Sequence, residues 1–220
     1  MDDGHFEKEL EELNKMIMNM GKLVEEAFYQ SSIVLIKRDI SLAKMIIEKD
    51  REIDLMELSI NKKCLQLLAL YQPVASDLRF ITSTMLVVTD LERIGDLSQD
   101  IAQRVIELKD KSAITSLSDL PILVEIVKTM VHESLDAFIE RDTLLAKKVP
   151  QMEINVKALR DAICKKLQEQ MVKNPTNVSW GLSLIHITRY LKRIGDHATN
   201  IVENVIYMVD AQVIKHKKRV

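Results

Sequence analysis

Apolar residues recur at intervals of three and four along most of this 220-residue chain. Ile94, Leu97, Ile101 and Val105 show the pattern, which places an apolar stripe along one side of a helix. No stretch bounded by turn residues alternates apolar and polar positions, so we expect no strands. The pattern predicts an all-α protein with six helices, over residues 5–37, 40–71, 75–108, 119–140, 143–172 and 177–214.

One six-residue phrase occurs nearly twice in the chain. Residues 91–96 read LERIGD, and residues 191–196 read LKRIGD, 100 positions later. A turn signal also recurs, because Arg38-Asp39 and Arg141-Asp142 precede matching helices at a step of 103 positions. The chain has only five glycines and four prolines, which favours long helices joined by short turns. A tandem duplication explains this layout.

The longest polar break between predicted helices covers residues 109–121. We interpret it as a linker between the duplicated halves, with Ser118 as the N-cap of the next helix and Pro121 in its first turn. The predicted architecture is two pseudo-symmetric antiparallel three-helix bundles, formed by residues 1–111 and 112–220.

Composition narrows the class of protein. The formal net charge is −2, which argues against general affinity for nucleic acid. No apolar stretch approaches the ~18 residues of a transmembrane helix, and the acidic N-terminus is not followed by the apolar run of a signal peptide. Two cysteines suit a reducing cytoplasm. The basic run at residues 215–219 is interpreted as a solvated helix end, with contact to acidic lipid or to a partner as the alternative.

Two rows of carboxylates lie at a spacing that puts each row on one face of a helix. They are Asp50 and Asp54 in one predicted helix, and Glu92, Asp96 and Asp100 in the next. Like charges at this spacing repel one another, and a hard or borderline cation would reverse that cost. The sequence therefore predicts a metal site formed by both rows. A solvated acidic face, neutralised in part by Arg93, is the alternative.

The corresponding face of the second half is mixed in charge. Lys192 stands in place of Glu92, four residues before Asp196. At the step of 103, Glu153 and Lys157 replace the acidic pair of the second predicted helix. Each pair of one acid and one base is favourable without a metal. We therefore expect metal on the first half only.

The two repeated phrases each place a glycine inside a predicted helix. Gly95 and Gly195 cost about 1 kcal/mol each relative to alanine in such a position. Close approach of a neighbouring helix is the structural explanation, and room for a bulky ligand is the functional one.

Several enzyme motifs are absent from the sequence. It has no Glu-x-x-His pair, no phosphate-binding Gly-rich loop, no His-Glu-x-x-His and no nucleophile elbow. The histidines are scattered, and His197, beside Asp196, is the one with a functional alternative to a core or surface role. These absences favour a protein without catalytic activity.

Three phrases resemble those of the PhoU family of phosphate-specific transport system accessory proteins. They are QPVASDLR at residues 72–79, LERIGD at 91–96 and LKRIGDHATNI at 191–201. The resemblance covers essentially the whole chain and includes its duplicated layout. It implies a cytoplasmic, non-catalytic negative regulator of phosphate uptake and of the phosphate-starvation response.

The resemblance also implies partners and a cofactor. The expected partners are the ATPase subunit of a phosphate ABC transporter and its sensor histidine kinase, with membrane contact only through them, and a homodimer is usual. Asp77 and Arg79, at the helix start after the first phrase, are candidate partner-binding residues; capping with a salt bridge is the alternative. Some members bind iron or zinc through Glu/Asp-x-x-x-Asp motifs. The first-half rows meet that pattern, whereas Lys157 and Lys192 break it.

Two other functions stay open on the sequence. A metal-dependent helical enzyme is disfavoured because no general base or nucleophile accompanies the acidic rows. A co-chaperone-like binding module is the other, because a three-helix bundle does not by itself fix a function.

Overall fold

The computed structural model describes residues 3–108 and 118–214, and helices make up nearly all of them. The long helices are α1 (Asp3–Lys37), α2 (Ile40–Tyr71), α3 (Ala75–Glu107), α4 (Asp119–Glu140), α6 (Val149–Lys173) and α7 (Val178–Asp210). Two short elements are the one-turn helix α5 (Thr143–Ala146) and the 3-10 helix η2 (Pro175–Asn177). None of the described residues forms a strand, so the predicted all-α class with six helices is confirmed.

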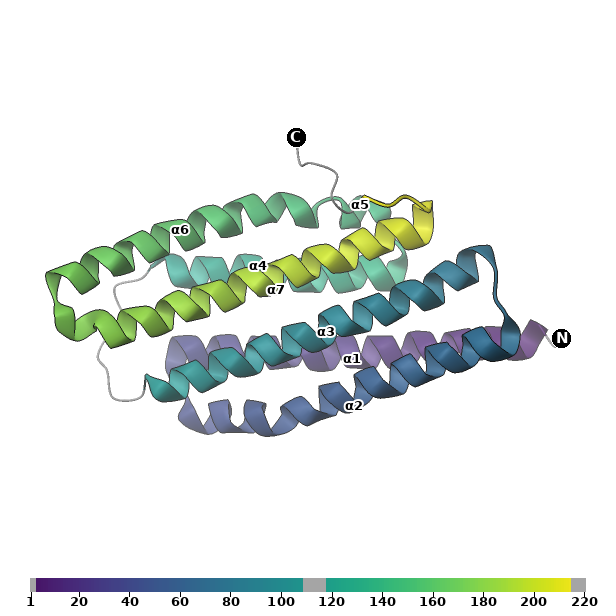
Figure 1. The fold of residues 1–220 in the computed structure, drawn as a ribbon, viewed down its shortest axis with the longest axis horizontal. Coiled ribbons are helices and arrows are strands. Elements are labelled where there is room, and N and C mark those ends of the chain that lie inside the picture. Colours follow the sequence, from purple (N-terminus) through teal and green to yellow (C-terminus); the bar gives the residue numbers. More distant parts are fainter. Residues whose placement is uncertain (1–2, 109–117, 215–220) are drawn as a thin grey trace.

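The helices form two bundles that lie side by side. Helices α1, α2 and α3 pack on one another, and α4, α6 and α7 do the same (Figure 1). Helix α3 packs along α7, and α1 packs on α4, so both bundles share a broad face. The boundary predicted between residues 111 and 112 falls within 109–117, outside the described residues, and stays a prediction.

The repeated Arg-Asp turn has the same geometry in both bundles. Arg38 and Arg141 adopt the left-handed backbone conformation, with φ of 58° and 55°, and each ends its helix. Asp39 and Asp142 then accept a hydrogen bond from the backbone N–H three residues later, at 3.0 Å in both turns. These aspartates satisfy an otherwise unpaired N–H of the next helix, as N-caps do. The duplication read from the sequence therefore extends to backbone geometry.

Three local predictions are wrong. The helix expected over 143–172 is interrupted between α5 and α6, because Pro150 lacks an N–H and its ring clashes with the carbonyl of Ala146, four residues earlier. The last helix ends at Asp210 rather than 214, where Ala211 turns left-handed with φ of 55°. Ser118 does not cap α4, because its hydroxyl donates to the Asp119 carboxylate at 3.3 Å instead of accepting from the helix.

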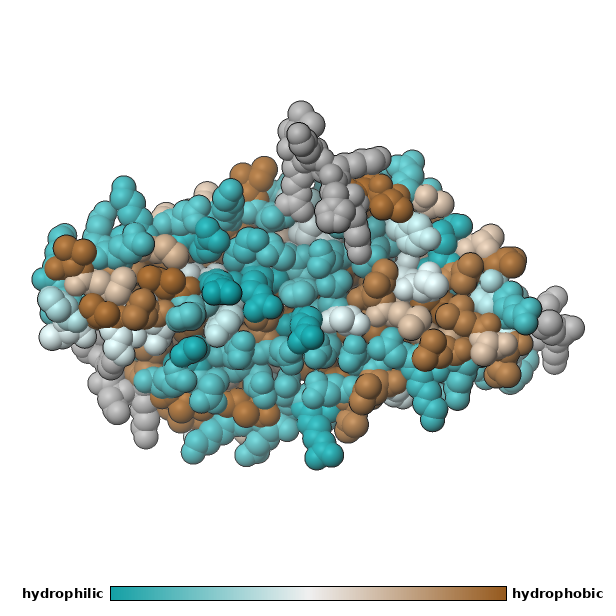
Figure 2. Space-filling view, viewed as in Figure 1, coloured by the Kyte–Doolittle hydropathy of each residue, from teal (hydrophilic) through white to brown (hydrophobic). Residues whose placement is uncertain are grey.

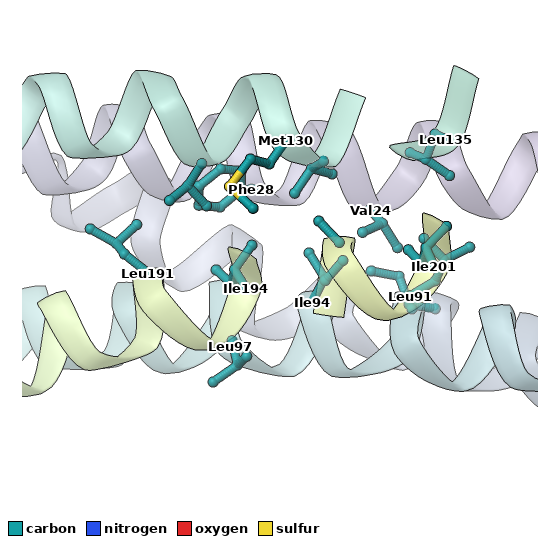
Figure 3. Close-up of a cluster of buried hydrophobic side chains, with 14 of the residues drawn as sticks. Val24, Phe28, Leu91, Ile94, Leu97, Met130, Leu135, Leu191, Ile194 and Ile201 are labelled. Atoms are coloured by element: carbon teal, nitrogen blue, oxygen red, sulfur yellow. The ribbon is translucent and has the colours of Figure 1, made fainter. Parts of the chain in front are cut away.

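The hydrophobic core runs without a break from one bundle to the other. Figure 3 shows buried side chains from four helices in one cluster: Val24 and Phe28 of α1, Leu91, Ile94 and Leu97 of α3, Met130 and Leu135 of α4, and Leu191, Ile194 and Ile201 of α7. All ten are at most 3% exposed. Each half therefore depends on the other to remove its inner face from water.

Candidate functional site

The acidic rows of the first bundle meet where α2 and α3 pack together. Asp50 and Asp54 project from α2, and Asp96 projects from α3 toward them. One carboxylate oxygen of each lies within 4.8 Å of the others. Such a group of three oxygens has the composition and spacing that a hard or borderline cation requires. The structure thus brings together three of the five predicted ligands.

The other two predicted ligands lie beside this group. Glu92 has its Oε2 buried, 3.3 Å from Nε of Arg93 but without the alignment of a hydrogen bond. Arg93 also donates to Asp96 at 2.9 Å. Arg93 therefore neutralises part of the charge of the acidic face, as the alternative to a metal site requires. Asp100 is exposed and is outside the group of three, although its charge helps to raise the pKa of Asp50, and burial together with the charge of Asp96 raises its own pKa. The acidic face therefore extends over two turns of α3.

Burial and repulsion both disfavour ionisation of this cluster. Burial, followed by the charges of Asp54, Asp96 and Asp100, raises the pKa of Asp50 to about 6. Burial, followed by Asp96, raises the pKa of Glu92 to about 6, while Arg93 acts in the opposite direction. These carboxylates are thus held ionised at neutral pH against an energetic cost, which a bound cation would remove.

We expect Asp50→Asn to stabilise the chain at neutral pH. The folded-state pKa of Asp50 lies above its ordinary value of 3.8, so the folded chain holds this proton more tightly than the unfolded chain does. The resulting stabilisation is complete below about pH 4 and is lost as the pH rises through about 6. In chelator, the variant should gain about 1 kcal/mol in unfolding free energy at pH 7.5, allowing for solvent screening of a half-buried group, and nothing at pH 4.

Urea unfolding at both pH values measures this difference. Glu11→Gln, which neutralises an exposed acid on α1, is the control and should leave the pH dependence of the wild type unchanged. A gain at pH 4 as large as that at pH 7.5 would show that packing, rather than charge, explains the effect.

Gly95 sits where α3 approaches α2 most closely in this cluster. A Cβ atom on Gly95 would lie 3.0 Å from Cδ1 of Ile53 and 3.6 Å from a carboxylate oxygen of Asp50. A Cβ on Gly195 would meet only Met130, at 3.4 Å from its sulfur. Close helix packing therefore accounts for Gly95, and this favours the structural explanation over room for a ligand.

The two glycines should respond differently to alanine. Gly195→Ala is expected to raise the unfolding free energy by about 1 kcal/mol, because alanine favours the helix and its methyl finds ordinary contact distance. Gly95→Ala should show no gain, because Ile53 must move. Guanidinium unfolding of the pair measures both, and an equal gain would contradict the asymmetry.

The second bundle carries a balanced pair at the corresponding place. Nζ of Lys192 lies 2.6 Å from a carboxylate oxygen of Asp196, and both side chains are about one third exposed. The predicted pairing of Lys192 with Asp196 is confirmed. Asp196 is paired with a lysine of its own helix, whereas Asp96 contacts Arg93 and also faces the carboxylates of Asp50 and Asp54 on α2.

Asp77 and Arg79 lie at the start of α3, as predicted. Asp77 accepts a hydrogen bond from the Ser76 hydroxyl at 3.4 Å, a long and weak contact. Arg79 donates from Nε to the carbonyl oxygen of Met208 at 3.1 Å, near the end of α7. Arg79 therefore joins the two bundles. Asp77 lies in the first turn of α3, and this end of α3 forms one tip of the molecule.

Sequence reasoning missed two groups near the site. Glu57 continues the α2 row, and its charge acts on Glu92; it stands three residues after Asp54, whereas only intervals of four were considered. Asp90 of α3 accepts from Asn200 at 3.0 Å and contacts Nδ1 of His197 at 2.8 Å, both on α7. His197 is thus a bridge between the bundles, a role that no local pattern indicates.

Comparison with known proteins follows the same division into halves. A family model described as "PhoU domain" matches the chain twice, over residues 17–105 and 120–205. The chain belongs to the PhoU family. Among its relatives, the phosphate-specific transport system accessory protein PhoU homolog of Aquifex aeolicus is 38% identical over 210 residues, which are 96% of this chain and 95% of that protein. The PhoU homolog of Pseudomonas aeruginosa is 38% identical over 96% of this chain and 88% of its own length.

Solved PhoU structures share the fold. The crystal structure of PhoU from Pseudomonas aeruginosa superposes with a TM-score of 0.91 at 38% identity, covering 94% of this chain and all of that one (100%). The phosphate transport system regulatory protein PhoU from Streptococcus pneumoniae superposes with a TM-score of 0.87 at 29% identity, covering 95% and 99%. Across the described helices of this PhoU-family chain, none has an apolar stretch long enough to cross a membrane.

Proposed function

We propose that this chain is an accessory protein of a phosphate-specific transport system that represses phosphate uptake and the phosphate-starvation response. It acts in the cytoplasm as a non-catalytic adaptor between the transporter's ATPase subunit and a sensor histidine kinase. The observation that carries the proposal is membership of the PhoU family over nearly the whole chain, with relatives named as accessory or regulatory proteins of phosphate transport. The expected homodimer belongs to the same proposal.

The exposed start of α3 is the part of the molecule best suited to partner contact. Leu70, Val74 and Leu78 surround it and are 70%, 74% and 40% exposed, an unusual density of large apolar side chains in contact with water. Asp77 supplies a negative charge at the same tip. A partner that covers this tip would bury apolar surface around one charged group, as protein interfaces do.

Asp77→Ala is expected to fold normally and to lose repression of phosphate-responsive genes in phosphate-replete cells. The carboxylate makes only a weak contact within the chain, so its removal should change the unfolding free energy by less than about 1 kcal/mol. A reporter fused to a phosphate-responsive promoter measures repression, and a pull-down with the ATPase subunit and the kinase measures contact. Asp142→Ala, which removes an N-cap in the second half, is the control for stability loss alone. Full repression by a stable Asp77→Ala chain would contradict a signalling role for this tip.

We also propose that the first-half acidic face binds a divalent or trivalent cation such as iron or zinc. The donor set supports the fit: three carboxylate oxygens lie within 4.8 Å of one another, and the buried Oε2 of Glu92 lacks a hydrogen-bond partner beside them. Asp50, Asp54 and Asp96 would hold the ion, with Glu92 and Asp100 at its edges. The bound charge would offset the repulsion that raises the pKa of Asp50 and would fix α2 against α3.

A further inference from the structure

The second bundle ends in an apolar tip that resembles the one at the start of α3. This second tip is the turn from α6 through η2 to α7, where Val172, Val178 and Leu182 are 84%, 41% and 48% exposed. Figure 2 shows apolar surface gathered at both ends of the molecule, with mostly hydrophilic surface between them. Clusters of exposed apolar side chains mark interaction sites on folded proteins, so both ends of the molecule are candidates for partner contact.

The duplication makes this second tip equivalent to the first tip, which is the turn from α2 to α3. Leu70 and Val172 are the next-to-last residues of α2 and α6. Leu78 corresponds to Val178 at the step of 100, and the two are 40% and 41% exposed. Apolar exposure at the tip therefore recurs with the repeated fold and is not particular to one half.

The two tips lie at opposite ends of the molecule. Helices α3 and α7 are equivalent in the duplication, pack along each other and run in opposite directions (Figure 1). A two-fold rotation therefore relates the halves approximately and exchanges the tips. Each of these helices has 33 residues, which corresponds to a separation of about 50 Å between the tips.

A molecule with two equivalent tips fits a partner that has two equivalent sites. A two-fold symmetric partner presents the same surface twice, and contact with both tips at once binds more strongly than either contact alone. An ABC transporter provides such a pair in its two ATPase subunits. Relatives of this chain are named as accessory proteins of a phosphate-specific transport system, which favours that pair. End-to-end stacking of copies of this chain would always leave a free tip, so it would not close.

We propose that the two tips bind the two ATPase subunits of the transporter at the same time, one subunit at each tip. The apolar part of the two contacts is alike, because equivalent side chains are exposed at both tips. The charge differs, since Asp77 of the first tip corresponds to the neutral Asn177 of the second. The inference rests on the proposed adaptor function for the identity of the partner.

The stoichiometry of binding to the isolated, nucleotide-free ATPase subunit tests each tip separately. With the subunit in excess, light scattering should find two subunits on the wild-type chain, one on Leu78→Asp or Val178→Asp, and none on the double variant, because each substitution places a charge in an apolar contact. Both substitutions should leave the fold intact, since the side chains are partly exposed and a carboxylate near a helix N-terminus is favourable. Leu55→Asp is the matched control, because Leu55 is 55% exposed in the middle of α2, and it should bind two subunits.

Binding to the intact transporter in nanodiscs tests whether both tips are used at once. One wild-type chain should bind to each transporter, at least about tenfold more tightly than it binds the isolated subunit, because the second contact forms within the same complex. Leu78→Asp and Val178→Asp should each lose this gain in affinity, and Leu55→Asp should keep it.

The outcomes separate the inference from the function. If the wild type binds the transporter and Val178→Asp binds as tightly, the second tip is not used; the inference is then wrong and the adaptor function stands. If the wild type binds neither the transporter nor its ATPase subunit, both proposals are overturned. Assemblies of the wild-type chain larger than a dimer, absent from Leu78→Asp, would assign the tips to copies of this chain and overturn the inference. Loss of binding to phosphatidylserine vesicles by the double variant, with transporter binding unchanged, would make the tips membrane contacts and also overturn it.

Discussion

Phe28→Ala should lower the free energy of unfolding by about 3–5 kcal/mol, the range for truncation of a buried aromatic side chain. Phe28 is 1% exposed and lies in the cluster that joins α1 and α3 to α4 and α7. Its loss opens a cavity between the bundles, where four helices must shift together to close it. Denaturant unfolding followed by circular dichroism measures the change. The transition should stay single, because neither half buries its inner face alone.

Ile36→Ala provides the control for this experiment. Ile36 lies on the same helix, is 52% exposed and should change stability by less than about 1 kcal/mol. Two separate unfolding transitions in the Phe28→Ala chain would contradict the continuous core, since they would show that each bundle is stable without the other.

Loss of metal from a variant of the first-half acidic face is the second large effect that we expect. Asp54→Asn combined with Asp96→Asn removes one carboxylate from α2 and one from α3, which leaves too few charged ligands to hold an ion. After incubation with iron or zinc and gel filtration, elemental analysis should find metal in the wild type and little in the double variant. Metal should also raise the thermal midpoint of the wild type and leave that of the double variant unchanged.

Asp196→Asn is the matched control, because Asp196 corresponds to Asp96 in the duplication. Its carboxylate is paired with Lys192 at 2.6 Å, and a cation placed there would meet an ammonium group. This variant should keep the metal of the wild type. Full metal retention by the double variant, or metal loss from Asp196→Asn, would contradict loading on the first half alone. A wild-type chain that stays free of metal would instead favour the solvated acidic face.

Local patterns in the sequence predicted most of the architecture because long helices dominate it. Apolar spacing and the scarcity of glycine and proline located the helices, and the repeated Arg-Asp turn located equivalent breaks. The interruption at Pro150 was missed because the apolar pattern continues across it, although the rigid ring prevents the hydrogen bond that the helix would need. The end of α7 was overestimated for a similar reason, since Val213 and Ile214 extend the apolar pattern beyond the left-handed Ala211.

The sequence predicted which acidic residues of the site share a face of one helix, but it did not predict the distances between residues on different helices. Spacing by four placed Asp50 with Asp54 and Glu92 with Asp96, but the distance between the rows depends on how α2 packs on α3. No local sequence pattern indicates the contacts between the two bundles. The partners of Asp90, His197 and Asn200, are more than 100 residues away.

Contacts between α1 and α4 occur in exchanged pairs. Glu25 meets His132 with 2.8 Å between oxygen and Nδ1, and Lys128 lies over the ring of Tyr29, 5.3 Å from its centroid. At the step of 103, Glu25 corresponds to Lys128 and Tyr29 corresponds to His132, so one contact appears twice with its partners swapped.

Such an exchange characterises the two-fold interface of a symmetric homodimer. A chain with one half alone would carry a self-complementary face, and the present molecule has the arrangement of two such subunits fused end to end. Fusion turned an interface between molecules into the core of one molecule. It also frees the two copies from exact symmetry, and the two sides differ: Glu92 belongs to an acidic face, whereas Lys192 stands at the corresponding place in the second half.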